Sequence, residues 1–489
     1  RTNRTLLISI LIAILFIAFA LNGMSAATAV SILLSGLTLG ALYFLVASGL
    51  SLIFGLMDVL NFAHGSLFML GAYAGWTVYT NPRLILNTAP LALALLAGVM
   101  LLPLIARRVH LPRVARWILA IGAAGLVLFA VRDFPLQKLV AFGTTVTGQV
   151  VPTSQAQESL EAMLLRVALM FVAGIVLSFA WARQESQQNA RVLSSLISLS
   201  SLLLLAFGLL FTRDFFEQFI LGMDTNLRFV LALLVGAGTG AGLGALMEFG
   251  LIRPLYARPI YQVLLTLGLV FIADQVVRLV WGPAGAFMQM PSWFANTGDA
   301  CPSPNFLDWF GAHCDSILVL GRPFPSYRIF IILVGAVMLG GIALLLRRSR
   351  LGMVIRAGVQ DSAMVEALGI NVRRVFTIVF ALGAGLAGLG GVVAAPFLGV
   401  YPGMALEFLL QAFIVVVIGG LGSVPGAALG ALVVGLGRAY GDQVVLAGIQ
   451  LPFMSEAFTG SPALARASTV LIMVIVLLLK PTGLLGKKE

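Results

Sequence analysis

The chain has 489 residues, of which 60% are hydrophobic and 10% are charged. Soluble domains contain roughly 45–50% apolar and about 25% charged residues, so this chain lacks the polar side chains that would cover a soluble enzyme, a secreted domain or a nucleic-acid-binding module. Its net charge of +11 comes from 30 basic and 19 acidic residues in a glycine-rich chain, and this composition predicts a polytopic membrane protein.

Hydrophobic runs of about 20 residues, the length that crosses a bilayer, follow one another along the chain. The first run, after Arg1 and Arg4, resembles a signal peptide, and we interpret it as a retained first helix. The runs 407–421 and 424–438 are short and flank a glycine turn, so they form either two spans or a re-entrant hairpin. We therefore predict an all-α membrane helix bundle of about 12–14 transmembrane helices. The runs are 6–21, 30–54, 60–78, 89–106, 115–131, 162–182, 192–211, 229–247, 263–281, 328–346, 375–395, 407–421, 424–438 and 466–480.

The basic residues separate by side when the N-terminus is placed in the cytoplasm and successive helices alternate in direction. This arrangement puts 19 of the 30 lysines and arginines inside, as the orientation rule for membrane proteins requires. Both termini are then cytoplasmic, and the positive balance reflects topology, so no nucleic-acid partner is needed to explain it. The inside residues are Arg1, Arg4, Arg107, Arg108, Arg113, Arg116, Arg183, Arg191, Arg253, Arg258, Arg347, Arg348, Arg350, Arg356, Arg373, Arg374, Lys480, Lys487 and Lys488.

Both cysteines, Cys301 and Cys314, lie in the stretch 282–326, which this topology places outside. An oxidising compartment permits a disulfide there, so we favour a bond between them over two free thiols. Trp293 and Trp309 in the same stretch are expected to be interfacial anchors or part of a small core.

The most unusual inside loop covers residues 347–374, where six basic residues flank a moderately apolar stretch. Apolar residues such as Met353, Met364 and Leu368 recur near helical spacing and predict a short helix. This helix either lies on anionic lipid headgroups or docks into a cleft of a cytoplasmic partner.

Polar residues at membrane depth are few, and we single out Asn61, His64 and the pair Asp274 and Arg278. An ion-coupled carrier usually needs a relay of such groups near the midplane, so we expect the energy source to lie outside this chain. Three histidines and two cysteines make a metal cluster improbable. The final GLLGKKE lacks the spacing and hydroxyl of a phosphate-binding loop, and no catalytic set is visible. Glycines at four-residue spacing, as in Gly236, Gly240 and Gly244, indicate closely packed helices.

Four stretches of the sequence closely resemble, in order, the signatures of bacterial branched-chain amino-acid ABC importer permeases of the LivH type. The first is GLTLGALYFLVASGLSLIFGLMDVLNFAHGSLFMLGAY, Gly36 to Tyr73, and the second is LIRPLYARPIYQVLLTLGLVFIADQVVRLVWGP, Leu251 to Pro283. The third is RSRLGMVIRAGVQDSAMVEALGINVRRV, Arg348 to Val375, and the fourth is FIVVVIGGLGSVPGAALGALVVG, Phe413 to Gly435.

The resemblance implies a multi-pass permease subunit of the bacterial inner membrane that imports branched-chain or other hydrophobic amino acids, or related small amides. It implies no enzyme activity and no cofactor on this chain, because ATP and Mg would be held by separate ATP-binding subunits. The further partners it implies are a second permease, either LivM-like or a second copy, an extracytoplasmic substrate-binding protein and membrane lipid.

The resemblance also assigns roles to individual residues. The coupling helix, which would meet the ATP-binding subunit, contains Gln360, Asp361, Glu366, Ala367 and Gly369. Two helical hairpins around the translocation pathway would contain Asn61, His64, Gly65, Gly420, Gly422 and Ser423. Close packing explains these glycines equally well, and His64 is either a pathway residue or a buried histidine bonded to backbone.

One block departs from the family pattern. Residues 80–228 insert additional hydrophobic segments between the first and second signatures, so we expect three parts: 1–79, 80–228 and a permease core at 229–489. The insertion is expected to be a lipid-facing bundle, a docking surface for the binding protein or a platform for another subunit.

Two other functions fit a chain of this composition. An ion-coupled secondary transporter would work without ATP and would depend on Asp58, His64 or Asp274. A non-transporting membrane scaffold or a membrane enzyme would not need the loop 347–374.

Overall fold

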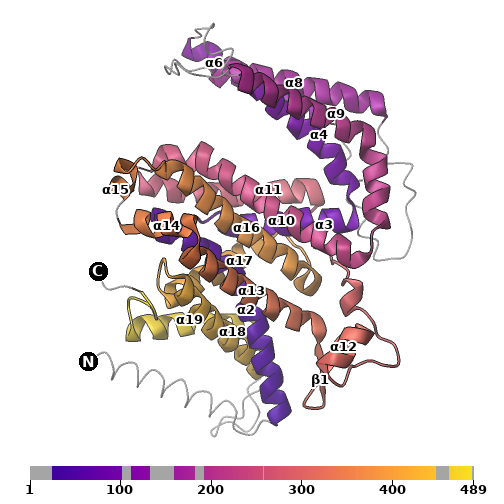
Figure 1. Cartoon of the computed structure of the whole chain (residues 1–489), viewed down its shortest axis with the longest axis vertical. Coiled ribbons are helices and arrows are strands. Elements are labelled where there is room, and N and C mark those ends of the chain that lie inside the picture. Colours follow the sequence, from indigo (N-terminus) through magenta and orange to yellow (C-terminus); the bar gives the residue numbers. More distant parts are fainter. Residues whose placement is uncertain are drawn as a thin grey trace. The chain divides into compact units, whose positions relative to one another are not determined.

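The computed structural model of the chain is mostly helical (Figure 1) and describes residues 25–101, 112–132, 159–181, 192–256, 258–360, 362–447 and 462–486. Within these ranges nine helices are long and apolar enough to cross a membrane, and three further apolar helices are shorter. Each predicted run from 30–54 onward overlaps a helix. The predicted first helix, 6–21, lies outside the described residues, as do eight of the basic residues assigned to the inside: Arg1, Arg4, Arg107, Arg108, Arg183, Arg191, Lys487 and Lys488.

Contacts divide the chain into two units. Unit 1 comprises Arg1–Trp76, Thr225–Arg278 and Pro283–Glu489, and unit 2 comprises Thr77–Asp224 and Leu279–Gly282. The insertion expected at 80–228 thus occupies nearly the same residues as unit 2. The helices that lie wholly in unit 2 are α4 (Arg83–Val99), α6 (Arg113–Val131), α8 (Leu160–Trp181) and α9 (Val192–Gly222).

In unit 1 the helices before the disulfide-containing segment are α2 (Ala26–Met57), α3 (His64–Thr80, which continues into unit 2), α10 (Thr225–Met247), the π-helix η2 (Glu248–Ile252), η3 (Arg253–Leu255) and α11 (Pro259–Trp281).

The remaining elements of unit 1 run from residue 292 to residue 479. They are η4 (Ser292–Phe294), α12 (Phe306–Ala312), β1 (Ser316–Val319), β2 (Arg322–Pro325), α13 (Ser326–Arg348), α14 (Arg350–Gln360), α15 (Ser362–Ala367), α16 (Val372–Leu398), α17 (Met404–Gly419), α18 (Val424–Ala447) and α19 (Pro462–Leu479). Helix α2 packs against α13, α16, α17 and α18, and α10 packs along α16.

Helix α16 is the most buried of the nine candidate spans, because its sequence is built from small residues. An added Cβ at Gly388 would overlap the carbonyl oxygen of Gly236 in α10, and one at Gly391 would overlap that of Phe68 in α3. The helix backbones therefore touch directly, which in lipid is a main source of helix association. This is the close approach that the four-residue glycine spacing predicts in α10.

Unit 2 is held together by its own contacts. Helix α4 packs on α8 and α9, and α6 packs on α8. An added Cβ at Gly98 would lie 2.8 Å from the Cα of Gly174, so α4 and α8 also meet through glycine. The guanidinium of Arg83 donates to Glu217 at 2.7 Å and so ties α4 to α9.

The segment between α11 and α13 contains the one sheet of the described residues, which the all-α prediction omitted. Strands β1 and β2 pair antiparallel around Leu320 and Gly321, both with positive φ. The sequence does not predict this hairpin, because Leu seldom occupies a turn position with positive φ. The prolines of β2 also argue against a strand. Cys301 and Cys314 are disulfide-bonded, with their Cα atoms 5.5 Å apart.

Helices α17 and α18 form an antiparallel hairpin around Gly420 to Ser423. Helix α17 has 16 residues and is one of the three short apolar helices, whereas α18 contains a candidate span. At 1.5 Å per residue α17 is about 24 Å long, less than the roughly 30 Å of a bilayer core. Only the second half of the hairpin therefore has the length of a full crossing.

Replacing Gly240 by alanine is expected to lower thermal stability, because the new Cβ would overlap the carbonyl oxygen of Ala384. Overpacking of this kind costs about 1–3 kcal/mol, which would appear as a lower unfolding temperature of the purified protein. Gly242→Ala is the matched control, since it lies on the same helix with open space around its Cβ position. Equal effects of the two changes would contradict this packing.

Candidate functional site

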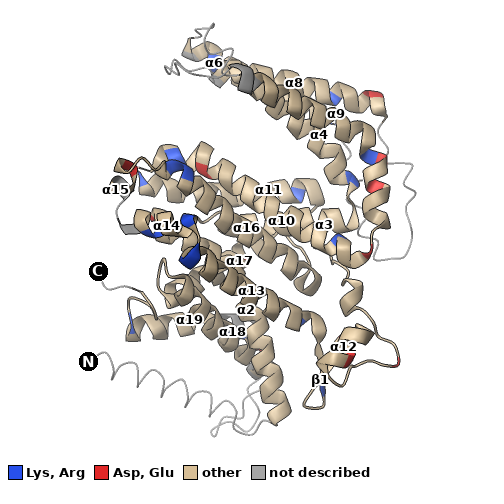
Figure 2. Ribbon diagram, in the orientation of Figure 1, with Lys and Arg blue, Asp and Glu red and all other residues tan. Residues whose placement is uncertain are grey.

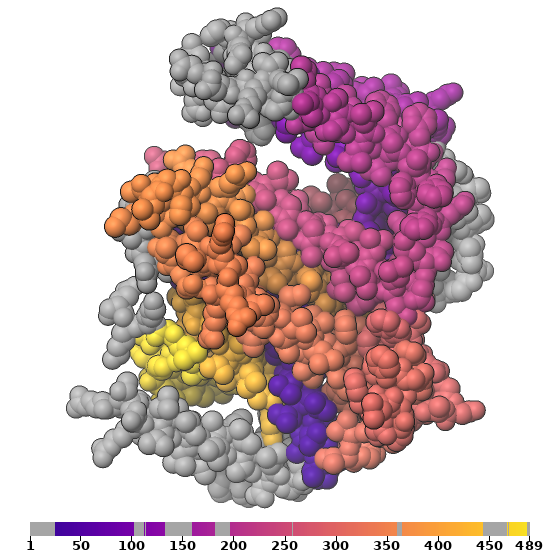
Figure 3. Space-filling model, viewed as in Figure 1, coloured from indigo at the N-terminus to yellow at the C-terminus, as the bar shows by residue number. Residues whose placement is uncertain are grey.

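Eight arginines of unit 1 lie between α10 and α11 and from the end of α13 to the start of α16, and we call this part of unit 1 the basic end. Figure 2 shows basic residues around α14 and α15, which are all arginines in the sequence, and Figure 3 shows this segment, in orange, on the surface. Helix α13 leads from the disulfide-containing segment to the basic end, so the two lie at opposite ends of unit 1. The described members are Arg253, Arg258, Arg347, Arg348, Arg350, Arg356, Arg373 and Arg374.

Helix α14 lies flat against the basic end and contacts α2, α13 and α16. Ile355 is 5% exposed, whereas Met353 on the other face is 63% exposed. Gly352 permits the sharp return from α13, because a Cβ there would overlap the carbonyl oxygens of Leu345 and Leu346. The sequence-predicted helix is therefore present, and it presents one face to the bundle and the other outward.

Helix α15 ends in a glycine turn that projects from the basic end. Gly369 has a φ of +82° and donates its N–H to the carbonyl of Glu366, while Ile370 donates to Val365. This pair of bonds is a Schellman C-cap, in which the glycine adopts the left-handed conformation. Glu366 and Gly369 line a surface hollow with Ile370, Asn371 and Arg373.

The structure brings together three of the five residues assigned to the coupling helix. Glu366 and Ala367 are exposed on α15, and Gly369 follows them in the turn. Gln360 is the last residue of α14. Asp361 lies outside the described residues.

A buried ionic cluster lies behind this segment and was missed by the sequence interpretation. The Glu248 carboxylate is fully buried and accepts hydrogen bonds from Arg253 at 3.0 Å, from the Tyr256 hydroxyl at 2.5 Å and from the Thr377 hydroxyl at 2.7 Å. Arg253 also donates to the Thr377 oxygen at 2.6 Å and to the carbonyl of Arg373 at 3.3 Å. We call these four side chains, Glu248, Arg253, Tyr256 and Thr377, the clamp.

The clamp joins the end of α10 to the first turns of α16. Its geometry depends on the π-helix Glu248–Ile252, because an i to i+5 turn places Glu248 and Arg253 on the same face. Side chains that pair on an α-helix are three or four residues apart, so a carboxylate and an arginine five residues apart did not predict an ion pair. Burial, followed by the hydrogen bond to Glu248, raises the pKa of the Tyr256 phenol, which therefore remains a neutral donor.

The first set of pathway candidates lies where the chain is not helical. Helix α2 ends at Met57 and is followed by Asp58 in the left-handed conformation, and α3 begins only at His64. Between them Asn61 is 1% exposed, and its side-chain oxygen accepts the N–H of Ala63 at 3.0 Å. Non-helical backbone at membrane depth is tolerated where it is buried in protein, and this segment meets that condition.

His64 is fully buried, and its Nε2 lies 3.0 Å from the carbonyl oxygen of Val46. Its Nδ1 and the Asn61 side-chain nitrogen have no hydrogen-bond partner among the described residues. An added Cβ at the neighbouring Gly65 would overlap the Ala405 carbonyl. Gly65 is therefore required for packing, while Asn61 and His64 retain unused polar atoms in the core.

The second set of candidates lies at the basic end. Gly420 and Gly422 both have positive φ, and Ser423 caps α18 by accepting the N–H of Gly426 at 3.1 Å. Gly422 packs against Gly55 of α2. Gly65 contacts Ala405 near the start of α17 and Gly420 follows its end, so these two glycines are separated by about 22 Å along the helix.

Metal ligands are not clustered in the part of the chain that the structure describes, where no three His, Cys, Asp or Glu side chains are placed to hold an ion.

Comparison with known proteins gives a consistent result. The family described as the permease component of branched-chain amino acid transport systems matches residues 186–479. The chain is 34% identical over 163 residues to the branched-chain amino acid permease protein BraD of Pseudomonas aeruginosa, covering 33% of this chain and 48% of that protein. It is 33% identical over 149 residues to LivH of Escherichia coli K12, covering 30% and 44%.

A third relative extends the similarity over more of the chain. LivM of Escherichia coli K12 is 24% identical over 312 residues, which are 57% of this chain and 70% of that protein. The chain spans about half the length of BraD and LivH. No solved structure matches the chain.

Exchanging Glu248 for glutamine is expected to lower the free energy of unfolding by about 2 kcal/mol, because hydrogen bonds to a buried charged group are lost. Asp274→Asn is the matched control: it removes the same charge from a carboxylate paired with Arg278 four residues away at 2.7 Å, but that pair is partly exposed. A smaller loss is expected there, because this pair closes within one helix and joins no second element. Equilibrium unfolding measures both, and an equal loss would show that the clamp contributes no more than an ion pair within one helix.

Proposed function

The chain belongs to the family of branched-chain amino acid transport permeases, and from this premise we propose that it is the permease subunit of an ATP-driven importer for branched-chain or other hydrophobic amino acids, or related small amides. The matched residues 186–479 include the coupling segment, the clamp helices and α17 with α18. The relatives BraD, LivH and LivM are permease proteins of branched-chain amino acid transport systems.

The proposed assembly has partners on both faces of a bacterial inner membrane. Two ATP-binding subunits meet the basic end in the cytoplasm, in agreement with the rule that basic loops face inward. A second permease, LivM-like or identical, lies beside this chain, and an external substrate-binding protein delivers the substrate. ATP and Mg are bound by the partner subunits, so this chain needs no cofactor of its own.

The observation that carries this proposal is the projecting turn at the basic end. Glu366 and Gly369 border an open hollow, and Leu368 between them is 75% exposed. An apolar side chain displayed beside a carboxylate and arginines suits contact with another protein, because a lipid-facing loop would not expose a carboxylate at its tip. This favours docking over the alternative of a helix lying on lipid headgroups.

The clamp supplies a route from the docking turn to the rest of unit 1. The turn leads into α16, and Thr377 in the second turn of α16 is bonded to Glu248 at 2.7 Å. A displacement of α15 is therefore passed both along α16, the most buried span, and across to α10. We infer that closure of the ATP-binding subunits moves α10 and α16 together.

Transport also requires a polar path through the apolar core. The break between α2 and α3 is our candidate, because Asn61 and His64 have side-chain nitrogens without partners among the described residues. A purely structural role is the alternative, supported by the contact of His64 with the Val46 carbonyl.

We propose a lipid-facing role for unit 2. Its helix α9 exposes large apolar side chains, among them Leu204 at 73%, Phe211 at 64% and Phe215 at 66%. Such a surface is stable in hydrocarbon and would be costly in water. This favours a lipid-facing bundle over a docking surface for a soluble binding protein.

Reversing the charge of Glu366, as in Glu366→Arg, is expected to weaken co-purification with the ATP-binding subunits and to abolish ATP hydrolysis stimulated by the loaded binding protein. Gly369→Ala should act in the same direction, because a left-handed alanine costs about 1–2 kcal/mol. Gly358→Ala is the control in the same segment, since its Cβ would make an ordinary 3.4 Å contact with Leu56. A complex with Glu366→Arg that survives and still couples hydrolysis to loaded binding protein shows the coupling assignment to be wrong.

Replacing His64 by alanine is expected to reduce substrate uptake into proteoliposomes while the purified complex stays assembled, because the core loses a polar group that a passing substrate or water would meet. His64→Gln retains a donor for the Val46 carbonyl and is expected to be less severe. Unchanged uptake and unchanged coupling of ATP hydrolysis in His64→Ala would rule out the pathway role.

A further inference from the structure

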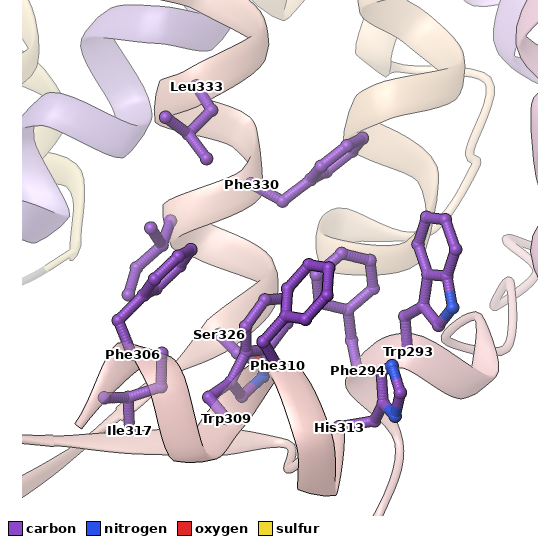
Figure 4. A pocket seen from close by; sticks show the side chains of 11 residues that line it. Trp293, Phe294, Phe306, Trp309, Phe310, His313, Ile317, Ser326, Phe330 and Leu333 are labelled. Atoms are coloured by element: carbon purple, nitrogen blue, oxygen red, sulfur yellow. The ribbon is translucent and has the colours of Figure 1, made fainter. Parts of the chain in front are cut away.

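An apolar cavity of about 480 Å³ lies between the disulfide-containing segment and the start of α13. Figure 4 shows its aromatic lining, with Leu333 along α13 on one side and His313 on the other. The wall side chains come from four elements of unit 1: η4, α12, β1 and α13. They include Trp293, Phe306, Trp309, Phe310, Phe330 and Leu333.

Two polar side chains in this wall, Trp309 and Ser326, already have hydrogen-bond partners within the protein. The Trp309 indole N–H donates to the Cys314 carbonyl at 2.8 Å, and the Ser326 hydroxyl donates to the same carbonyl at 2.8 Å. The aromatic rings stack on one another, with Phe306 and Trp309 centroids 5.4 Å apart. The cavity therefore offers an occupant mainly apolar contact, and its volume lies in the range of small-ligand sites.

The position of the cavity along α13 indicates where the occupant comes from. Ser326 is the first residue of α13 and Leu333 lies about 10 Å further along the helix axis, so the cavity extends into the membrane-crossing stretch. Leu333 is 51% exposed and Val337, one turn on, is 67% exposed. The mouth of the cavity is thus continuous with a helix surface that, in a span of mean hydropathy 2.9, faces lipid.

We propose that this cavity binds an acyl chain of a membrane lipid from the leaflet opposite the basic end. The chain enters beside Leu333 and lies against Phe330 and Trp309, with the lipid's polar region near His313. Aromatic side chains at the membrane boundary favour this arrangement. The bound chain holds η4 and α12 against the start of α13, whereas the disulfide joins only Cys301 and Cys314. The proposal requires membrane insertion but not transport, so it stands or falls independently of the proposed substrate.

Photo-crosslinking of the full chain in lipid nanodiscs tests this site. The probe is a phosphatidylglycerol with a diazirine on one acyl chain, diluted into phosphatidylethanolamine, and adducts are mapped by peptide mass spectrometry. We expect adducts on residues 293–313 as well as on α13. Phe310→Glu places a charge in the cavity wall at a residue that is 70% exposed, and it should lower the yield on 293–313 about tenfold.

Two matched controls separate the cavity from the general lipid surface. Leu307→Glu changes a residue of the same helix that is 83% exposed and does not line the cavity, so its yield should equal that of the unaltered protein. Leu333→Trp should block entry, whereas Val337→Trp on the same face should not. Adducts confined to α13 would overturn the proposal, as would equal adduct yields on 293–313 in Phe310→Glu and Leu307→Glu. Either result would indicate that the cavity holds a protein segment or is empty.

Discussion

Direct contact between helix backbones is the constraint on which unit 1 depends. The hydrophobic effect cannot hold apolar helices together when the surrounding lipid is equally apolar, so close packing must do so. Helix α16 meets this requirement with glycines, since Gly388 admits the backbone of Gly236 and Gly391 admits that of Phe68. These contacts leave no room for a side chain between the backbones of α16 and those of α3 and α10.

Such rigid packing restricts where polar groups and irregular backbone occur. The non-helical break before His64 is stable because α2 and α17 pack around it. Its backbone N–H groups also donate to the side chains of Asn61 and Thr266. The clamp follows the same rule at the basic end, where the Glu248 carboxylate receives hydrogen bonds from three side chains. Unmet polar atoms in lipid are costly, so each of these features persists only because its neighbours are fixed.

The sequence predicted the features that follow from local periodicity. Hydrophobic runs located the helices, the family resemblance located the segment of α14 and α15, and glycine spacing indicated the close helix packing. It did not predict the clamp, because Glu248 and Arg253 are five residues apart and an α-helix would place them on different faces. The hairpin at Leu320 and the late start of α3 at His64 were missed for a related reason: both depend on backbone conformations that only tertiary contacts stabilise. The sequence also did not predict that Gly65 and Gly420 lie at opposite ends of α17, because two sequence motifs do not by themselves give the distance between them.

The location of buried charge also bears on how energy enters the protein. Among the described residues Glu248 is the one acidic side chain that is fully buried, and it lies at the basic end beside the start of α16. A carrier driven by an ion gradient needs titratable groups along its path near the membrane centre. A carboxylate locked by Arg253, Tyr256 and Thr377 instead has no free position for an ion, and its bonds join two helices. The arrangement suits a protein that is moved mechanically from its basic end, where the exposed turn at Gly369 leads directly into α16.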